Sequence, residues 1–237
     1  MDKAPLHAFA GYGVELEYMI VDRESLAVRP VADVLLRAED GSVVNELARG
    51  HFAWSNEVTL HILELKNECP DPTLESLPGG FQAEVQAINA RLDRQGARLM
   101  PTAMHPWMNP AVETQLWPHE HAALYTTYDR IFNCRRHGWA NLQSMHLNFP
   151  FADDAEFVRL HEAIRLVLPI LPALAASSPL AEERITGFLD TRMEIYRGHQ
   201  IAVPETIGAV IPDSTTGIAD YQARVLQPMY AAIAPLD

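Results

Sequence analysis

The sequence has few cysteines and no long apolar run. Cys69 and Cys134 are too few for a disulfide framework among 237 residues, and neither belongs to a zinc-type pattern of Cys and His. No apolar run reaches the roughly 18 residues that a membrane-spanning helix needs, and the N-terminus lacks the apolar segment of a signal peptide. We therefore expect a soluble, cytoplasmic protein without a membrane partner.

Basic side chains are also scarce. The chain has 18 Lys and Arg against 31 Asp and Glu, which gives a formal net charge of −13. A surface of this charge repels a phosphate backbone, so nucleic acid is not an expected partner. An anionic ligand such as ATP would need a metal ion and a few local arginines.

Internal repeats, low-complexity segments and Gly, Ser or Pro-rich linkers are absent too. With 48% hydrophobic residues, a chain of 237 residues can bury a sizeable core. No composition shift marks a domain boundary. We expect a single domain over residues 1–237.

Apolar periodicity predicts an α+β fold. Strands are expected at 12–22, twice within 51–70, from 97 into a Pro-punctuated loop, and at 141–151. Helices are expected at 30–40, 74–96, 119–134, 154–180 and near 218–233. Pro169 and Pro172 should kink or end the helix over 154–180, whose apolar run at 164–176 we place in the core. Since this order lacks a regular βαβ rhythm, a mixed or mostly antiparallel sheet with helices on one side is favoured over a doubly wound one.

The segment "YGVELEYMIVD", residues 12–22, carries two glutamates on one strand face. The period of two places Glu15 and Glu17 together. The opposite face is apolar and consists of Val14, Leu16, Tyr18 and Ile20. Two carboxylates one pleat apart repel each other. Either a cation or plain solvent must separate them.

The segment "NLQSMHLNFPF", residues 141–151, has a similar polar face. Ser144, His146 and Asn148 share it, opposite an apolar face. The apolar face consists of Met145, Leu147, Phe149 and Phe151. A histidine in the middle of a polar strand face can bind a metal or a phosphate. The alternative is a solvated strand face with an incidental histidine.

The segment "EVTLHILELKNECP", residues 57–70, adds Glu57 and Glu64. Their separation of seven is odd, so in an unbroken strand they would point to opposite faces. A bulge or a strand break would let both reach one site. His61 shares the face of Glu57 and is a spare candidate. Alternatively, Glu64 and Glu68 are surface charges at a strand end.

Taken together, these segments supply hard oxygen ligands and one imidazole. Such a set suits Mg²⁺ or Mn²⁺ better than a metal that prefers thiolates. The candidate ligands are Glu15, Glu17, Glu57, Glu64 and His146. Acidic sets of this kind on a sheet typically hold metal ions that bridge nucleotide phosphates.

Five segments, in order, resemble the glutamate-cysteine ligase family, in particular its bacterial second family of carboxylate-amine ligases. They are "GVELEYMIVD", "NEVTLHILELKNECP", "SMHLNFPF", "LPILPALAASSPL" and "DTRMEIYR", and the resemblance runs from about residue 10 to about 200. It implies the fold of the glutamine synthetase catalytic domain, a curved antiparallel sheet that forms a funnel with helices outside. The implied reaction joins the side-chain carboxylate of glutamate to the amine of cysteine, using ATP and passing through a γ-glutamyl phosphate.

The resemblance also implies roles for particular residues. Glu15 and Glu17 are each expected to face a different metal ion, and His146 to bind the ion nearer the transferred phosphate. The acidic pair of the next strand falls on Glu57 and Glu64. Three further residues are expected to contact the nucleotide or substrate carboxylate: Arg192 first, then Arg197, and more weakly Asn148. A surface charge is the alternative for Arg192, whose guanidinium would otherwise stabilise the phosphoryl group in transit.

The chain departs from the family pattern near its end. Family members usually supply a further metal-binding glutamate from a later strand, in a Glu-x-Arg setting, and the tail after residue 202 has no such pattern. We therefore expect a fragment or a natural short form. One hypothesis is an ATP-dependent ligase that is complete elsewhere or as a homo-oligomer. The alternative is a catalytically incomplete nucleotide or amino-acid binding module, and a third, weaker one is an unrelated metal-dependent hydrolase.

Overall fold

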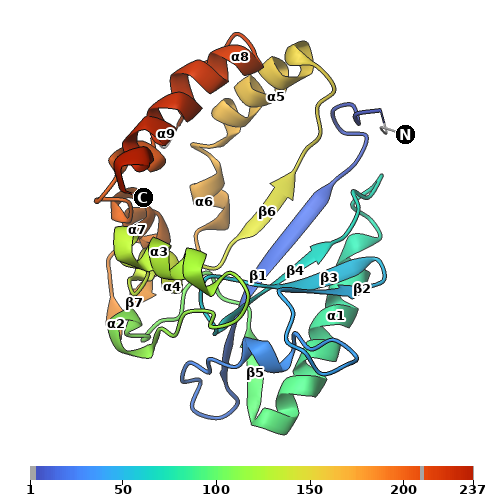
Figure 1. The fold of residues 1–237 in the computed structure, drawn as a ribbon, viewed down its shortest axis with the longest axis vertical. Helices are drawn as coiled ribbons and strands as arrows, with labels where there is room; N and C mark the ends of the chain where they lie inside the picture. The colour runs from blue at the N-terminus through green and yellow to red at the C-terminus, as the bar shows by residue number, and fades with distance from the viewer. Residues whose placement is uncertain (1–3, 209–210, 237) are drawn as a thin grey trace.

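The computed structural model describes residues 4–208 and 211–236, which form an α+β fold around one antiparallel sheet (Figure 1). The strand order is β2-β3-β4-β1-β5, and β6 also pairs with β1. Its strands are β1 (Gly13–Asp22), β2 (Glu46–Arg49), β3 (Phe52–Asn56), β4 (Ile62–Asn67), β5 (Ala97–Met100) and β6 (Met145–Asn148). A separate pair consists of β7 (Leu180–Ala181) and β8 (Arg184–Ile185). Among the described residues no pairing joins the sheet's two edges, so the sheet is open.

Helices lie on both sides of this sheet, not on one side as expected: α1 covers one face (Figure 1), and Ala140 of α4 packs on the other. The α-helices are α1 (Leu77–Leu92), α2 (Pro110–Glu113), α3 (Ala122–Phe132), α4 (His137–Ala140), α5 (Asp154–Val167), α6 (Leu171–Ala175), α7 (Thr191–Gly198), α8 (Ile218–Tyr221) and α9 (Gln227–Ile233). A π-helical segment, η4 (Gln222–Leu226), joins α8 to α9, and short 3-10 turns are η1 (Ala32–Val34), η2 (Asp93–Gln95), η3 (Pro204–Thr206) and η5 (Ala234–Leu236). In the described part of the chain, no helix is both long and apolar enough to span a bilayer.

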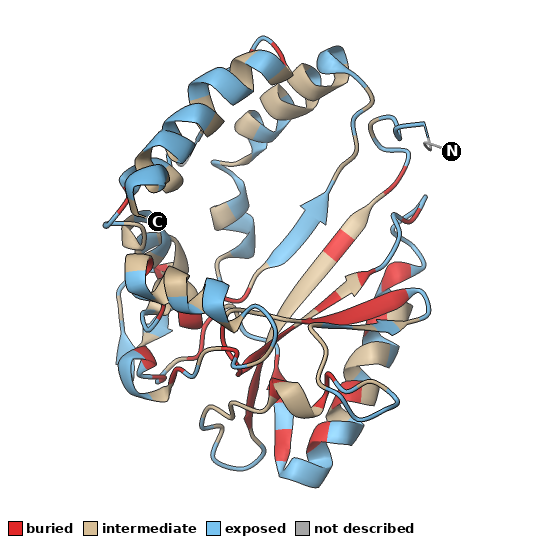
Figure 2. Cartoon of the chain, viewed as in Figure 1, coloured by how far each residue is buried: buried red, intermediate tan, exposed pale blue. Residues whose placement is uncertain are grey.

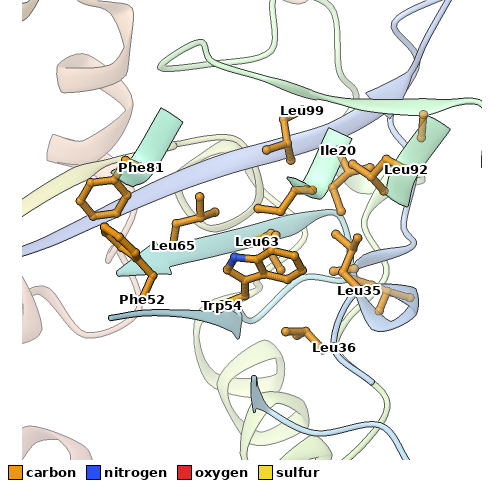
Figure 3. Close-up of a cluster of buried hydrophobic side chains, with 14 of the residues drawn as sticks. Ile20, Leu35, Leu36, Phe52, Trp54, Leu63, Leu65, Phe81, Leu92 and Leu99 are labelled. Carbon is orange, nitrogen blue, oxygen red and sulfur yellow. The ribbon is translucent and has the colours of Figure 1, made fainter. Parts of the chain in front are cut away.

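The core lies between one face of the sheet and α1. The apolar face predicted for β1 is confirmed, because Val14 and Ile20 are buried in this core and Leu16 and Tyr18 pack against it. Helix α1 contributes side chains at the expected helical spacing: Leu77, Phe81, Ile88 and Leu92. Figure 3 shows the centre of the cluster, where Trp54 and Leu63 meet. Burial of each large apolar side chain is worth about 1.5–3 kcal/mol, so this layer holds the sheet rigid.

The other face of the sheet changes character along β1. In the N-terminal half of the strand this face carries Glu15 and Glu17. Further along the strand, Met19 and Val21 are buried in a second apolar cluster with Met100 and Met108. The C-terminal half of β1 is therefore buried on both faces. In its N-terminal half, only one face is apolar, and the polar face can form a site.

Several predicted elements are confirmed. The segment 51–70 forms two strands, the helix over 74–96 is α1 followed by η2, and the chain from 97 forms β5 and then a loop. The helix over 119–134 is α3, and the run near 218–233 is α8, η4 and α9. The prolines break the helix over 154–180 as expected, since α5 ends at Val167 and α6 begins at Leu171.

Three local predictions are wrong or too long. The helix over 30–40 is one 3-10 turn, because the chain then reverses at residues 39–41 and the Val44 amide donates to the Leu36 carbonyl (2.9 Å). The strand over 141–151 shrinks to β6, whose apolar side chains Met145 and Leu147 are exposed. The apolar run at 164–176 is not core: Leu166 is 77% exposed and Leu174 is 78% exposed.

Candidate metal centre

Strand register brings the predicted acidic residues together. Glu17 on β1 lies directly opposite Glu64 on β4, and Glu15 lies opposite His146 on β6. Directly paired residues of antiparallel strands share a face, so these side chains meet on the polar face of the sheet. The sequence placed Glu15 and Glu17 on this face through their spacing, but their partners depend on the pairing.

Glu57 joins this group because the chain breaks between two strands. β3 ends at Asn56 and β4 begins at Ile62, so Glu57 lies in the connection and not in a continuous strand with Glu64. The odd spacing of seven residues therefore does not separate the two glutamates. The strand break that the sequence required for a shared site is present.

Two groups of potential ligands result. Glu15, Glu64 and His146 have ligand atoms within 4.8 Å of one another, and so do Glu17, Glu57 and Glu64. Glu64 belongs to both groups. A pair of sites that share one carboxylate is an arrangement able to hold two cations close together.

Burial makes this concentration of negative charge costly. Burial, followed by the charges of Glu17 and Glu64, raises the pKa of Glu57 to about 8. Burial also raises the pKa of Glu17 above its ordinary value, against the lowering effects of its hydrogen bond from Ser144 and of His146. Divalent cations would remove this cost because they favour the ionised carboxylates.

Hydrogen bonds fix the orientation of the acids. The Asn148 side chain donates to Glu15 Oε1 (2.9 Å), and the Ser55 hydroxyl donates to Glu64 Oε1 (2.8 Å). His146 Nδ1 lies 2.9 Å from Glu15 Oε2. Asn148 and His146 therefore engage both carboxylate oxygens of Glu15, whereas no hydrogen bond among the described residues engages Glu64 Oε2.

Arg192 reaches the same group from α7. Its guanidinium donates to the Ser144 hydroxyl (2.6 Å), while the Ser144 amide donates to Glu17 Oε2 (2.8 Å). Asp190 caps the N-terminus of α7, and Ser178 accepts a hydrogen bond from the Arg192 amide (3.2 Å). The buried Arg192 Nε has no hydrogen-bond partner among the described residues.

Two candidates from the sequence, Arg197 and His61, lie away from this group. Arg197 forms an exposed ion pair with Glu194 (3.0 Å), and neither belongs to the two ligand groups found among the described residues. His61 is fully buried and its Nε2 lies 2.8 Å from the Ala140 carbonyl, so it is not a spare ligand. Burial lowers the His61 pKa to about 4. The prediction that His61 shares a face with Glu57 assumed a continuous strand, and the turn between β3 and β4 interrupts that strand.

Sequence reasoning missed two residues on this face, Ser55 and Lys66. Ser55 pairs with Glu64 in the register, and Lys66 pairs with Glu15. Lys66 lies two residues after Glu64, so strand alternation alone could have placed it on the same face. Ser55 had no comparable signal, since only the pairing of β3 with β4 brings it to Glu64.

Comparison with known proteins is consistent with this geometry. The family model described as glutamate-cysteine ligase family 2 matches residues 12–234. An Archaeoglobus fulgidus protein whose name assigns no function is 34% identical over 218 residues, which cover 92% of this chain and 58% of that protein. A Rubrobacter xylanophilus protein named "Putative glutamate--cysteine ligase 2-3" is 29% identical over 192 residues, which cover 78% of this chain and 47% of that protein.

The chain thus spans about half the length of the curated relatives it matches. The family match includes every strand that carries a candidate ligand, and it also includes α7 with Arg192. On this evidence the chain belongs to glutamate-cysteine ligase family 2.

Proposed function

We propose that the chain carries the site of an ATP-dependent carboxylate-amine ligase, with glutamate and cysteine as the joined substrates. The observation that supports it most is the pair of ligand groups that share Glu64, with Arg192 beside them. Family membership and the name of the Rubrobacter relative favour the same reaction. We further propose that the open sheet is part of a glutamine synthetase-like funnel.

The donor set fits Mg²⁺ or Mn²⁺. Carboxylate oxygens and one imidazole are ligands that these ions accept, and none of the five side chains offers a thiolate. The proposed ligands are Glu15, Glu17, Glu57, Glu64 and His146. When bound, such ions offset the charge of a triphosphate and polarise its terminal phosphoryl group.

The reaction has two displacements. The glutamate side-chain carboxylate forms a bond to the γ-phosphorus as the bond to the ADP oxygen breaks. The amine nitrogen then bonds to the acyl carbon, phosphate leaves and the amine loses a proton. Arg192, fixed by Ser144, would contact the equatorial phosphoryl oxygens, and the planar guanidinium suits that contact better than an ammonium does.

The test measures ADP release from the 237-residue chain with ATP, Mg²⁺, glutamate and candidate amines. We expect release that depends on the metal and on both substrates. Glu17→Gln should abolish metal-dependent nucleotide binding and leave the circular dichroism spectrum unchanged, because it removes a ligand charge without changing side-chain volume. Glu75→Gln, at an exposed glutamate outside both ligand groups, is the matched control.

Two results would contradict the proposal in different ways. If Mg²⁺-ATP binds but no ADP forms with any amine, the chain is the catalytically incomplete binding module. If no nucleotide binds with Mg²⁺ or Mn²⁺, the site has another function, and turnover without nucleotide would indicate a metal-dependent hydrolase.

A further inference from the structure

A single lysine lies on the acidic face of the sheet. Lys66 on β4 is paired with Glu15 on β1, so both side chains project from the same face. Its Nζ lies 2.6 Å from Glu46 Oε2 and 3.8 Å from Glu64 Oε1. The side chain is 27% exposed, so part of it remains open to solvent.

Lysine is rare in this sequence. Only Lys3 and Lys66 are lysines among its 18 basic residues, and Lys3 lies outside the described residues. An ammonium is a compact charge with three donors on a flexible stem, whereas arginine presents a wide, planar fork. Among the described residues, Glu46 is the acceptor within hydrogen-bonding distance of the Lys66 ammonium. Two of its three donors are thus available for another acceptor.

The two cations near the site lie on opposite flanks of the acids. Lys66 comes from β4, on the side of the sheet that continues to β3 and β2, whereas Arg192 reaches Ser144 just before β6. An anion held by both would have to extend across the acidic group. A polyphosphate carries several negative oxygens along its length, whereas a single carboxylate does not.

We propose that the Lys66 ammonium binds a phosphate oxygen of the nucleotide, on the flank opposite Arg192. This inference rests on the proposed function, because it assumes that a metal-nucleotide complex occupies the acidic face. Once bound cations neutralise the charges of Glu15 and Glu64, the electrostatic attraction of these carboxylates for the Lys66 ammonium weakens. The ammonium then pairs with Glu46 on one side and with phosphate on the other.

Binding measurements on variants test the contact. Lys66→Met should weaken the binding of Mg²⁺-ATP about tenfold, as expected for the loss of one charge-assisted hydrogen bond. Lys66→Arg keeps the charge and should retain most of the affinity. The affinity for Mn²⁺ alone should not fall in either variant, because neither change removes a metal ligand.

A double variant separates this role from a structural one. Lys66→Met leaves Glu46 without its cation, whereas Lys66→Met combined with Glu46→Gln removes both charges. If Lys66 only neutralised Glu46, the double variant would regain the nucleotide affinity of the wild type, and the inference would be wrong. We expect it to keep the tenfold loss.

Chemical labelling gives a second readout in the unchanged protein. An acyl phosphate derivative of ATP transfers its acyl group to a nearby lysine: the new bond joins the acyl carbon to Nζ, the bond from that carbon to the phosphate oxygen breaks, and Nζ loses a proton. We expect Mg²⁺-dependent acylation of Lys66 that excess ATP prevents, with Lys3 as the internal control. Unlabelled Lys66 in protein shown to bind Mg²⁺-ATP, or wild-type affinity in Lys66→Met, overturns this inference alone. Absence of any nucleotide binding overturns the proposed function with it.

Discussion

The two halves of the chain differ in how many apolar side chains they bury. The segment from Gly13 to Trp117 holds the main apolar cluster, with Trp54, Leu63 and Leu65 fully buried. Helices α5, α6, α8 and α9 of the second half bury no residue (Figure 2). Yet the second half supplies His146 and Arg192 to the candidate site. Stability and site residues are therefore unequally divided, because apolar burial is the main stabilising contribution to folding.

A Leu→Ala substitution in each half should give the largest difference in the free energy of unfolding. Leu63→Ala removes a fully buried side chain and should lower the free energy of unfolding by about 4 kcal/mol, from lost burial and the cavity left behind. Leu166→Ala, at a side chain that is 77% exposed, should change it by less than about 0.5 kcal/mol. Urea unfolding followed by circular dichroism measures both. Equal losses would show that the second half is packed as tightly as the first.

A smaller effect on stability, which depends on pH, should follow from the raised pKa of Glu57. Its folded-state pKa of about 8 lies above the ordinary 4.5, so the metal-free folded protein holds a proton that the unfolded chain releases between these values. The favourable contribution is complete below pH 4.5 and is lost as pH rises toward 8. The loss should be on the order of 3 kcal/mol.

Thermal unfolding with a chelator, between pH 4.5 and 8, measures this dependence. Glu57→Gln should flatten the profile, since it removes the titrating group. Added Mn²⁺ should raise the melting temperature most at pH 8, where the carboxylate is ionised at least cost. A wild-type profile that is already flat would mean that Glu57 is solvated in the metal-free protein.

The smallest effect on stability, with a clear effect on activity, is expected in α7. Arg192→Lys keeps the charge but loses the fork that bonds Ser144, so ADP release should fall about tenfold, equivalent to about 1.4 kcal/mol. Arg197→Lys is the matched control, because Arg197 lies on the same helix in an exposed pair with Glu194. Unfolding free energies of both should stay within about 0.5 kcal/mol of the wild type. Equal losses of activity would return Arg197 to the candidate site.

Much of the sheet and part of the site were predictable from local pattern. Alternation along β1 predicted both the core face and the Glu15 and Glu17 face, since side chains of a strand alternate whatever its neighbours are. The odd spacing of Glu57 and Glu64 required a strand break, which the two strands β3 and β4 provide. The preference for Arg192 over Arg197 came from the family resemblance, not from local pattern, and Arg192 is the one that contacts Ser144 while Arg197 pairs with Glu194.

The exposed helices show where such reasoning fails. The run at 164–176 has the composition of a core helix, but composition does not indicate whether another element covers it. The prediction for His61 failed for a different reason, since a local turn interrupts the alternation that placed it with Glu57. The missing information concerned distant neighbours for the run at 164–176, and the turn between β3 and β4 for His61.

By itself, the sequence determined which residues share a strand face, because backbone geometry fixes the period of two. It therefore determined that Glu15 and Glu17 lie together and that the opposite face of β1 is apolar. Only the tertiary structure decided that Glu64, His146 and Lys66 meet them, since register depends on the pairing of strands that are distant in sequence. It also decided that Arg192 joins the site, because Ser144 and the docking of α7 hold it there.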